Sequence, residues 1–123
     1  MAKKRMKGSL AEELISERTI EVQLFHQWAD WPAVVVVAKA DTGADKSSID
    51  FGLAEAMDWD EIGSSRIRTS TGIERRTNVR GTVSINGTKF LLRANVCDRS
   101  EMSHPVLIGH DVLKDLIALE EEE

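Results

Sequence analysis

The sequence has a single cysteine, Cys97, in 123 residues. One chain therefore cannot build a disulfide framework, which fits a reducing compartment. No apolar run reaches the roughly 20 residues that a membrane helix needs. The basic start is not followed by the apolar core of a signal peptide, because Glu12, Glu13 and Glu17 interrupt it. We therefore expect a cytoplasmic protein without a membrane partner.

An excess of positive charge is also missing. The formal net charge is −5, which gives no reason to expect nucleic acid as a partner. The charged ends are basic at residues 3–7 and acidic at 120–123, and such runs are usually solvated tails. We expect residues 1–18 to form a flexible basic arm with a short helical turn, 19–119 the folded domain, and 120–123 an acidic tail.

The motifs of two common cofactor sites are absent. The chain has no G-x-x-x-x-G-K-[S/T] loop for the phosphates of ATP and no H-E-x-x-H pair for zinc. The candidate soft ligands are Cys97, His104 and His110, with His26 remote in sequence, and their spacings match no standard metal site. We expect no metal and no cofactor.

The most informative stretch present is Ala33–Asp50, AVVVVAKADTGADKSSID. Four valines, bounded by Pro32 and a glycine turn, predict a buried strand. The strand delivers Asp41 onto a tight turn, where Gly43 allows a backbone shape or a close approach that a side chain would block. The simplest interpretation is an Asp-Gly turn that closes a core strand.

The same turn also suits aspartic-protease chemistry. Those enzymes hold two carboxylates a few ångströms apart, and two like charges that close share one proton. The ionised carboxylate takes a proton from water while the protonated one polarises the scissile carbonyl. Asp41 is the candidate carboxylate, and no metal or covalent intermediate is needed.

Most of the other segments predict strands. Thr19–Leu24 alternates apolar and polar residues, as a half-exposed strand does. Leu53–Trp59 has helical spacing, and Ile62 and Gly63 predict a turn. We expect Trp28 and Trp31, in the loop before Pro32, to pack over an open edge of the barrel.

Two β-hairpins follow in the sequence. The segment Arg66–Val79 has polar arms around a Ser70-Thr71-Gly72 tip, which predicts a hairpin with a mobile end. Thr82–Ile85 and Thr88–Val96 flank Asn86-Gly87, a strong type I′ turn signal. After a polar loop, Pro105–Leu113 reads as an apolar strand, a glycine and a helix that starts near Asp111.

These three features resemble those of the retropepsins, the small homodimeric aspartic proteases. Asp41-Thr42-Gly43-Ala44-Asp45 resembles their active-site motif, the first hairpin their flap, and Val106–Leu113 their strand–glycine–helix segment, in the same order. The resemblance covers roughly Ala33–Leu119. The layout is most similar to a bacterial and phage branch labelled "ATP-dependent zinc protease", a label against which the missing ATP and zinc motifs argue.

The resemblance implies an all-β fold, an acid-protease type of closed β-barrel with one or two short helices. It implies an aspartic-type peptidase whose partners are a peptide or protein substrate and a second copy of the chain, because the sequence has only one Asp-Thr-Gly. It assigns catalysis to Asp41, Thr42 and Gly43, substrate contacts to Ala44, Asp45, Ser70, Thr71, Gly72 and Ile73, and dimer or structural support to Ile108, Gly109 and His110.

The sequence departs from the retropepsin pattern at His110. Retropepsins usually carry an arginine there, which pairs with the aspartate at the position of Asp45. A His–Asp pair is charge-assisted only while the imidazole is protonated, so we expect dimer or active-site integrity to depend on pH. The hairpin tip has one glycine where retroviral flaps have several.

Two other functions remain open from the sequence. One is a non-catalytic dimerisation or peptide-binding module, against which the intact Asp-Thr-Gly argues. The other is a peptidase for glutamate-rich tails, because bacterial relatives in this branch are associated with processing linked to ribosomal-protein glutamylation. Arg66, Arg68, Arg75 and Arg76 near the hairpin would suit such a substrate, although they can equally be solvated surface arginines.

Overall fold

The computed structural model describes residues 18–121, and the side chains of 18–119. Of the basic arm expected over residues 1–18, residues 1–17 lie outside the described residues. The elements, in chain order, are β1 (Thr19–Phe25), β2 (Pro32–Asp41), β3 (Ser48–Asp50), α2 (Phe51–Met57), β4 (Asp60–Thr69), β5 (Gly72–Ile85), β6 (Thr88–Cys97), β7 (Val106–Gly109) and α3 (His110–Glu121).

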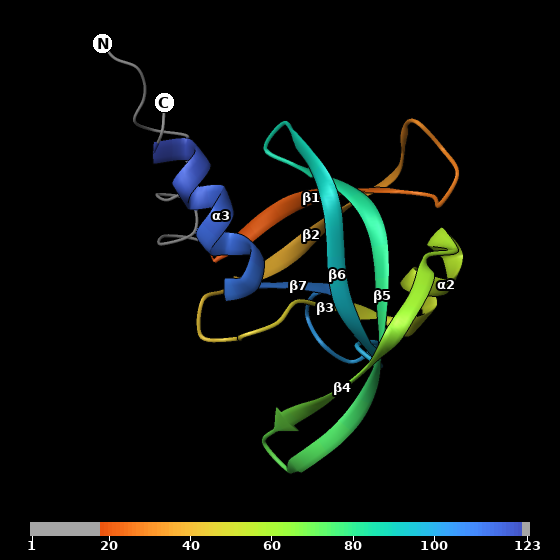
Figure 1. Ribbon diagram of the computed structural model, residues 1–123, viewed down its shortest axis with the longest axis vertical. Coiled ribbons are helices and arrows are strands. Elements are labelled where there is room, and N and C mark those ends of the chain that lie inside the picture. Colours follow the sequence, from red (N-terminus) through yellow and green to blue (C-terminus); the bar gives the residue numbers. More distant parts are fainter. Residues whose placement is uncertain (1–17, 122–123) are drawn as a thin grey trace.

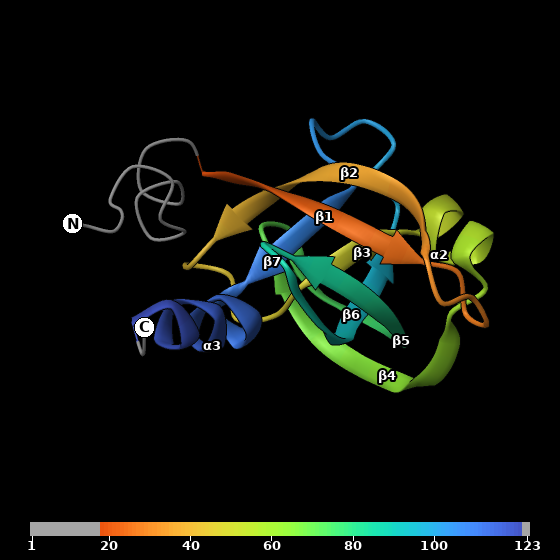
Figure 2. The ribbon, with the colours of Figure 1, turned by 90° about the horizontal axis from the view of Figure 1, so that it is seen from above.

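The strands form one sheet that curls into a ring (Figures 1 and 2). The strand order is β1-β2-β7-β3-β6-β5-β4, and β1 also pairs with β5 at Gln23↔Ser84 and Leu24↔Val83. This pairing closes a ring of six strands. β4 pairs with residues 72–80 of β5, which precede the stretch that pairs with β1. The predicted all-β fold with short helices is therefore confirmed, although the strands make a ring with a projecting hairpin and not a regular barrel.

Alternating side chains from the ring fill its interior. Because successive residues of a strand point to opposite faces, each strand places every second residue inward, as in the pattern of β1. The fully buried large side chains come from five strands and from α3; they are Val22, Leu24, Ile49, Val83, Ile85, Leu92, Val106, Ile108 and Leu113. Burying each such side chain stabilises the fold by roughly 1.5–3 kcal/mol before entropy is counted.

The valine run of β2 is a strand, as predicted, but it is not buried throughout. Val35 and Val37 keep 52% and 47% of their surface exposed, while Val34 and Val36 are half-buried. The strand lies on the ring with one face toward the core and the other toward solvent, so its period-2 geometry divides the four valines between the two faces.

The two predicted hairpins are confirmed, and a predicted turn is not. Asn86 and Gly87 have φ values of 51° and 84°, the positive values that a type I′ turn requires. Ile62 and Gly63, expected to form a turn, lie inside β4. Gly63 has φ 132° at an irregularity in the pairing with β5, so the glycine there marks a bulge within a continuous strand.

Helix α2 begins two residues earlier than the sequence predicted. The side chain of Asp50 accepts a hydrogen bond from the Gly52 N–H and caps the helix, and Asp58 ends it in the left-handed conformation. Trp59 consequently lies beyond the helix, where it is buried and its indole Nε1 donates to the Phe25 carbonyl (2.8 Å). The ring of Trp59 covers Gly81 so closely that a Cβ on Gly81 would overlap it.

Trp28 and Trp31 contradict the expectation that they cover an edge of the barrel. Their exposed fractions are 81% and 69%. The loop between β1 and β2 carries both indoles outward, away from the strands it connects.

None of the described helices is long and apolar enough to span a membrane.

Replacing Gly81 with alanine should destabilise the fold by about 2–3 kcal/mol, because the new methyl group occupies the space of the Trp59 ring. Urea denaturation measures the change. In a Trp59→Ala background the same substitution should have a much smaller effect, since the clash is gone. An equal decrease in the free energy of unfolding in both backgrounds would show that the Trp59 ring is not the reason why residue 81 must be glycine.

A Trp59→Phe variant should keep the emission of solvent-exposed indoles. Because Trp28 and Trp31 are both largely exposed, their fluorescence should be red-shifted and strongly quenched by acrylamide. Acrylamide titration of the folded variant checks this, with the denatured variant as the reference for full exposure. Weak quenching of the folded variant would mean that another surface covers the two indoles.

Candidate functional site

Asp41 is the last residue of β2, at the edge where the ring opens onto the turn of residues 42–47. β2 runs parallel to β7, and Asp41 is paired with Gly109. Its carboxylate is partly exposed. The pairing of β2 with β7 therefore places the candidate catalytic carboxylate beside the strand–glycine–helix segment. Asp41 thus lies close to Ile108, Gly109 and His110.

The turn itself is held by its own aspartate. The Gly43 N–H donates to Asp41 Oδ1 (2.9 Å), and the Ala44 N–H donates to the Asp41 carbonyl (3.1 Å). Within the described residues no other donor reaches the Asp41 carboxylate. Thr42 and Gly43 are exposed. One carboxylate oxygen is thus oriented by the backbone, and the other remains available to a water, a substrate or a second carboxylate.

Gly109 lets β7 pass directly behind the turn. A Cβ on Gly109 would lie 2.7 Å from the carbonyl carbon and oxygen of Lys46 and 2.8 Å from the Ala44 oxygen. These are backbone atoms, which cannot move aside as a flexible side chain could. The next residue strengthens the contact, because the His110 N–H donates to the Ala44 carbonyl at 2.7 Å.

Ser47, whose role the sequence did not reveal, joins the turn to both β7 and α3. Its fully buried hydroxyl group accepts a hydrogen bond from the Gly109 N–H (3.0 Å) and donates to Asp111 Oδ1 (3.0 Å). The Ser47 N–H also donates to Asp111 Oδ2 (3.3 Å). The only sequence signals were a serine after the turn and an acidic residue in the first turn of a helix, which are too common to identify such a contact.

The expected pair of Asp45 and His110 is not formed within the described part of one chain. Both side chains are exposed, and no ion pair joins them. His110 contacts the turn through its backbone, while Asp111, the next residue, supplies the carboxylate that the turn uses. A His110–Asp45 contact across a dimer remains a prediction.

The predicted flap is the β4–β5 hairpin, which projects from the ring (Figure 1). Thr69 Oγ1 donates to the Gly72 carbonyl (3.1 Å) and accepts from the Thr71 N–H (3.3 Å), so the tip forms a compact turn. Gly72 has φ 136°, which favours glycine. Ser70, Thr71 and Ile73 are exposed at the far end, and the structure does not bring them to Asp41.

The loop between β6 and β7 contributes a buried arginine that the sequence did not indicate. Arg99 is 7% exposed; its Nε donates to the His104 carbonyl (2.9 Å) and its Nη1 to Ser48 Oγ (3.2 Å). Its backbone N–H donates to Asp50 Oδ1 (2.8 Å). The guanidinium fastens this loop to β3, the strand that directly follows the turn segment.

The same loop contains one perturbed carboxyl group. The hydroxyl group of Ser100 donates to Asp98 Oδ1 (2.6 Å), and the Ser100 N–H donates to the same oxygen (2.9 Å). These bonds favour the ionised form and lower the pKa of the Asp98 carboxyl, which is fully exposed. The turn that begins the loop is therefore held most firmly once the carboxyl is ionised.

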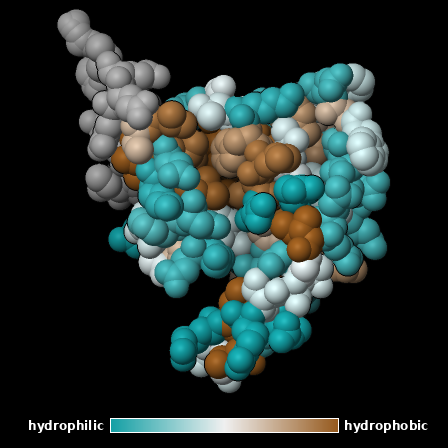
Figure 3. Space-filling model, viewed as in Figure 1, coloured by the Kyte–Doolittle hydropathy of each residue, from teal (hydrophilic) through white to brown (hydrophobic). Residues whose placement is uncertain are grey.

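A hollow of about 540 Å³ lies beside the turn and not over Asp41. Figure 3 shows apolar side chains gathered in a depression beside α3. Its apolar lining comes from β4, β6 and α3, including Ile67, Phe90 and Leu116. Lys46 and Ser47 border it where the turn segment ends. Among residues 18–119, no three His, Cys, Asp or Glu side chains group closely enough to hold a metal ion.

No protein-family profile matches the sequence, and no curated protein matches it. Solved structures do share its shape. The simian foamy virus protease has a TM-score of 0.58 at 16% identity, over 80% of this chain and 94% of that chain. A Legionella pneumophila protein of unknown function has a TM-score of 0.55 at 19% identity, over 80% and 84% of the two chains.

The retroviral protease-like domain of Ddi1 from Leishmania major has a TM-score of 0.50 at 20% identity, over 79% of this chain and 72% of that chain. At such identities the likeness concerns the arrangement of the backbone alone. It agrees with the mostly-β architecture described above. The chain therefore has a retroviral protease-like fold.

Proposed function

We propose that this chain is an aspartic endopeptidase that acts as a homodimer. The observation that carries the proposal is the Asp41 turn. Its carboxylate is partly exposed, is oriented by the Gly43 N–H and stands at the end of a core strand. The retroviral protease-like fold supports this assignment, because it places the turn beside β7 and provides a projecting hairpin.

The second carboxylate comes from the second copy. One chain offers one Asp-Thr-Gly, so a two-fold axis beside Asp41 would bring two Asp41 side chains together in a symmetric site. Because like charges at short distance cannot both ionise, the pair would hold one proton and titrate as a unit. Thr42, which is exposed next to Asp41, would hydrogen-bond across that axis.

Hydrolysis then needs only the shared proton and a water. The ionised carboxylate accepts a proton from the water as it attacks the peptide carbonyl, and the protonated partner donates its hydrogen bond to the carbonyl oxygen. Gly43, Ala44 and Asp45 lie next to Asp41 and would contact the substrate backbone. The hairpin tip, Ser70–Ile73, would move over the bound peptide and exclude water.

A preference for acidic substrates is a second candidate. In the β4–β5 pairing Arg66 lies directly opposite Arg75, and Arg68 follows on the same face. Like charges directly opposite one another destabilise a sheet, and all three arginines are exposed. Arg76 lies opposite Ser65, on the other face. A carboxylate-rich peptide bound beside the arginines would relieve this repulsion.

The other alternative, a non-catalytic binding module, has no comparable use for the Asp41 turn.

Asp41→Asn should lower peptide cleavage at least a hundredfold or so, because the amide cannot act as the base. Cleavage of a diverse peptide library at several pH values is the measurement, with Asp115→Asn on the exposed side of α3 as the matched control. Wild-type activity should rise faster than linearly with protein concentration, and excess Asp41→Asn protein should inhibit it through mixed dimers. Cleavage by the Asn variant at the wild-type rate would contradict the proposal.

Reversing Arg66 and Arg75 to glutamate should reduce kcat/KM for a glutamate-rich peptide about tenfold and leave a neutral peptide nearly unaffected. Lys114→Glu, an exposed charge reversal on α3, provides the control. The wild-type preference should also weaken as salt is added. Equal losses on the two peptides would remove the acidic-substrate candidate and leave the general peptidase in place.

A further inference from the structure

The projecting part of the β4–β5 hairpin has few connections to the ring. β5 pairs with β6 only from Asn78 to Ile85, so residues 72–77 of β5 pair with β4 alone. Side-chain hydrogen bonds in this part stay within the two strands, as those of Arg75 Nη1 to Ser64 Oγ (2.9 Å) and Asn78 Nδ2 to Ser65 Oγ (2.7 Å) do.

Arg76 is the exception. Its Nη1 donates to Asn95 Oδ1 on β6 at 2.8 Å, and its Nε donates to the Glu74 carboxylate on the hairpin. Within the described residues, this is the one side-chain hydrogen bond that joins residues 64–77 to a strand outside the hairpin. The Arg76 side chain is only 17% exposed, and that of Glu74 is 50% exposed. The guanidinium therefore bridges the hairpin and the ring from a largely buried position.

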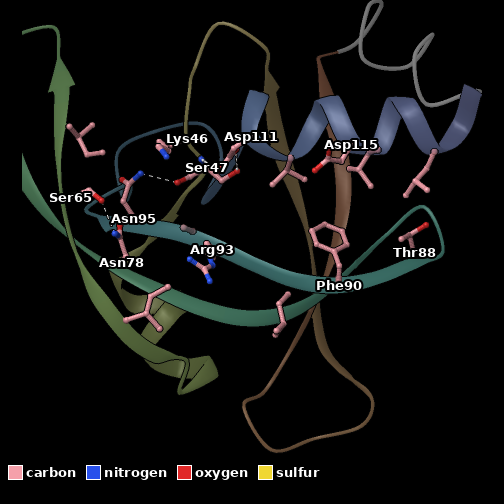
Figure 4. A pocket seen from close by; sticks show the side chains of 17 residues that line it. Lys46, Ser47, Ser65, Asn78, Thr88, Phe90, Arg93, Asn95, Asp111 and Asp115 are labelled. Carbon is pink, nitrogen blue, oxygen red and sulfur yellow. Dashed lines mark hydrogen bonds between the residues drawn. The ribbon is translucent and has the colours of Figure 1, made fainter.

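Asn95 is in turn hydrogen-bonded to the end of the candidate active-site turn. It is 4% exposed, and its Nδ2 donates to the Ser47 carbonyl (2.8 Å), which also accepts from the Asn95 N–H (3.0 Å). Figure 4 shows Asn95 and Asp111 reaching Ser47 from opposite sides. One chain of hydrogen bonds thus runs from Glu74 and Arg76 through Asn95 to Ser47, six residues after Asp41 in the sequence.

We propose that Arg76 is a positioning residue that sets the angle between the β4–β5 hairpin and the Asp41 turn. Arg76 lies two residues beyond the last β5–β6 pair, at the root of the projecting segment. A small displacement there is magnified at the tip. The planar guanidinium offers donors in fixed directions, so binding Glu74 and Asn95 together restricts the hairpin more than a single contact would. The effect of Arg76 on catalysis rests on the proposed function, whereas its effect on the position of the hairpin does not.

The structural consequence is tested without any substrate. In a Cys97→Ser background, spin labels at Thr71→Cys on the tip and Lys114→Cys on α3 report the distribution of distances between them. The wild-type distribution should be narrow, and Arg76→Met should broaden it roughly twofold. Arg76→Lys should restore part of the order, because an ammonium group can still reach Asn95. Arg93→Met, which makes the same substitution at an exposed arginine of β6, should change nothing.

An unchanged distribution in a folded Arg76→Met protein would overturn the proposal. If that variant does not fold, Glu74→Gln carries the test, since Glu74 is half exposed and its loss removes only the orienting carboxylate. Partial broadening in Glu74→Gln then supports the proposal, and an unchanged distribution overturns it.

Peptide cleavage tests the catalytic consequence. A badly placed hairpin weakens binding of substrate and transition state alike, so Arg76→Met should raise KM about tenfold and leave kcat within about twofold. Equal kcat losses in Arg76→Met and Arg93→Met, with KM unchanged, would overturn the positioning role. Broadening by Arg76→Met in a protein that cleaves no peptide would leave the positioning role intact and refute the proposed peptidase.

Discussion

The surroundings of Asp41 depend on one buried hydroxyl group, that of Ser47. It accepts from the Gly109 N–H and donates to Asp111, while the Ser47 carbonyl accepts twice from Asn95. A buried polar group without a partner costs about 1–3 kcal/mol, so these bonds hold together three segments that are remote in sequence. The Asp41 turn, β6 and the start of α3 have defined relative positions because they meet at this residue.

Local sequence signals were sufficient to predict most of the elements. The Asn86-Gly87 turn, the alternation in β1 and the strand–glycine–helix segment each depend on neighbours along the chain, and the structure agrees with them. Asp41 was identified for the same reason, because its motif is contiguous. Gly109 was also found from a contiguous pattern, although the close approach of the Lys46 backbone that requires glycine there became visible only in the structure.

The features that escaped prediction depend on contacts between distant segments. Ser47, Asn95 and Arg76 are ordinary polar residues until the ring closes and places them side by side. The errors have the same origin. Trp28 and Trp31 were expected to cover an edge of the barrel, but both indoles are largely exposed. The valines of β2 are shared between an inner and an outer face. Composition alone cannot show which surfaces face each other.

The closure of the ring has a consequence for the way the chain folds. β4, β5 and β6 are joined by short turns and can pair soon after collapse, but β1 must meet β5 across Leu24 and Val83, and β7 must enter between β2 and β3. Such non-local pairings need long loops to close before any contact compensates for the lost entropy, which slows folding. The residues around Asp41 belong to these late pairings. We therefore expect the β4–β5–β6 hairpins to form before the pairings of β7 that complete the surroundings of Asp41.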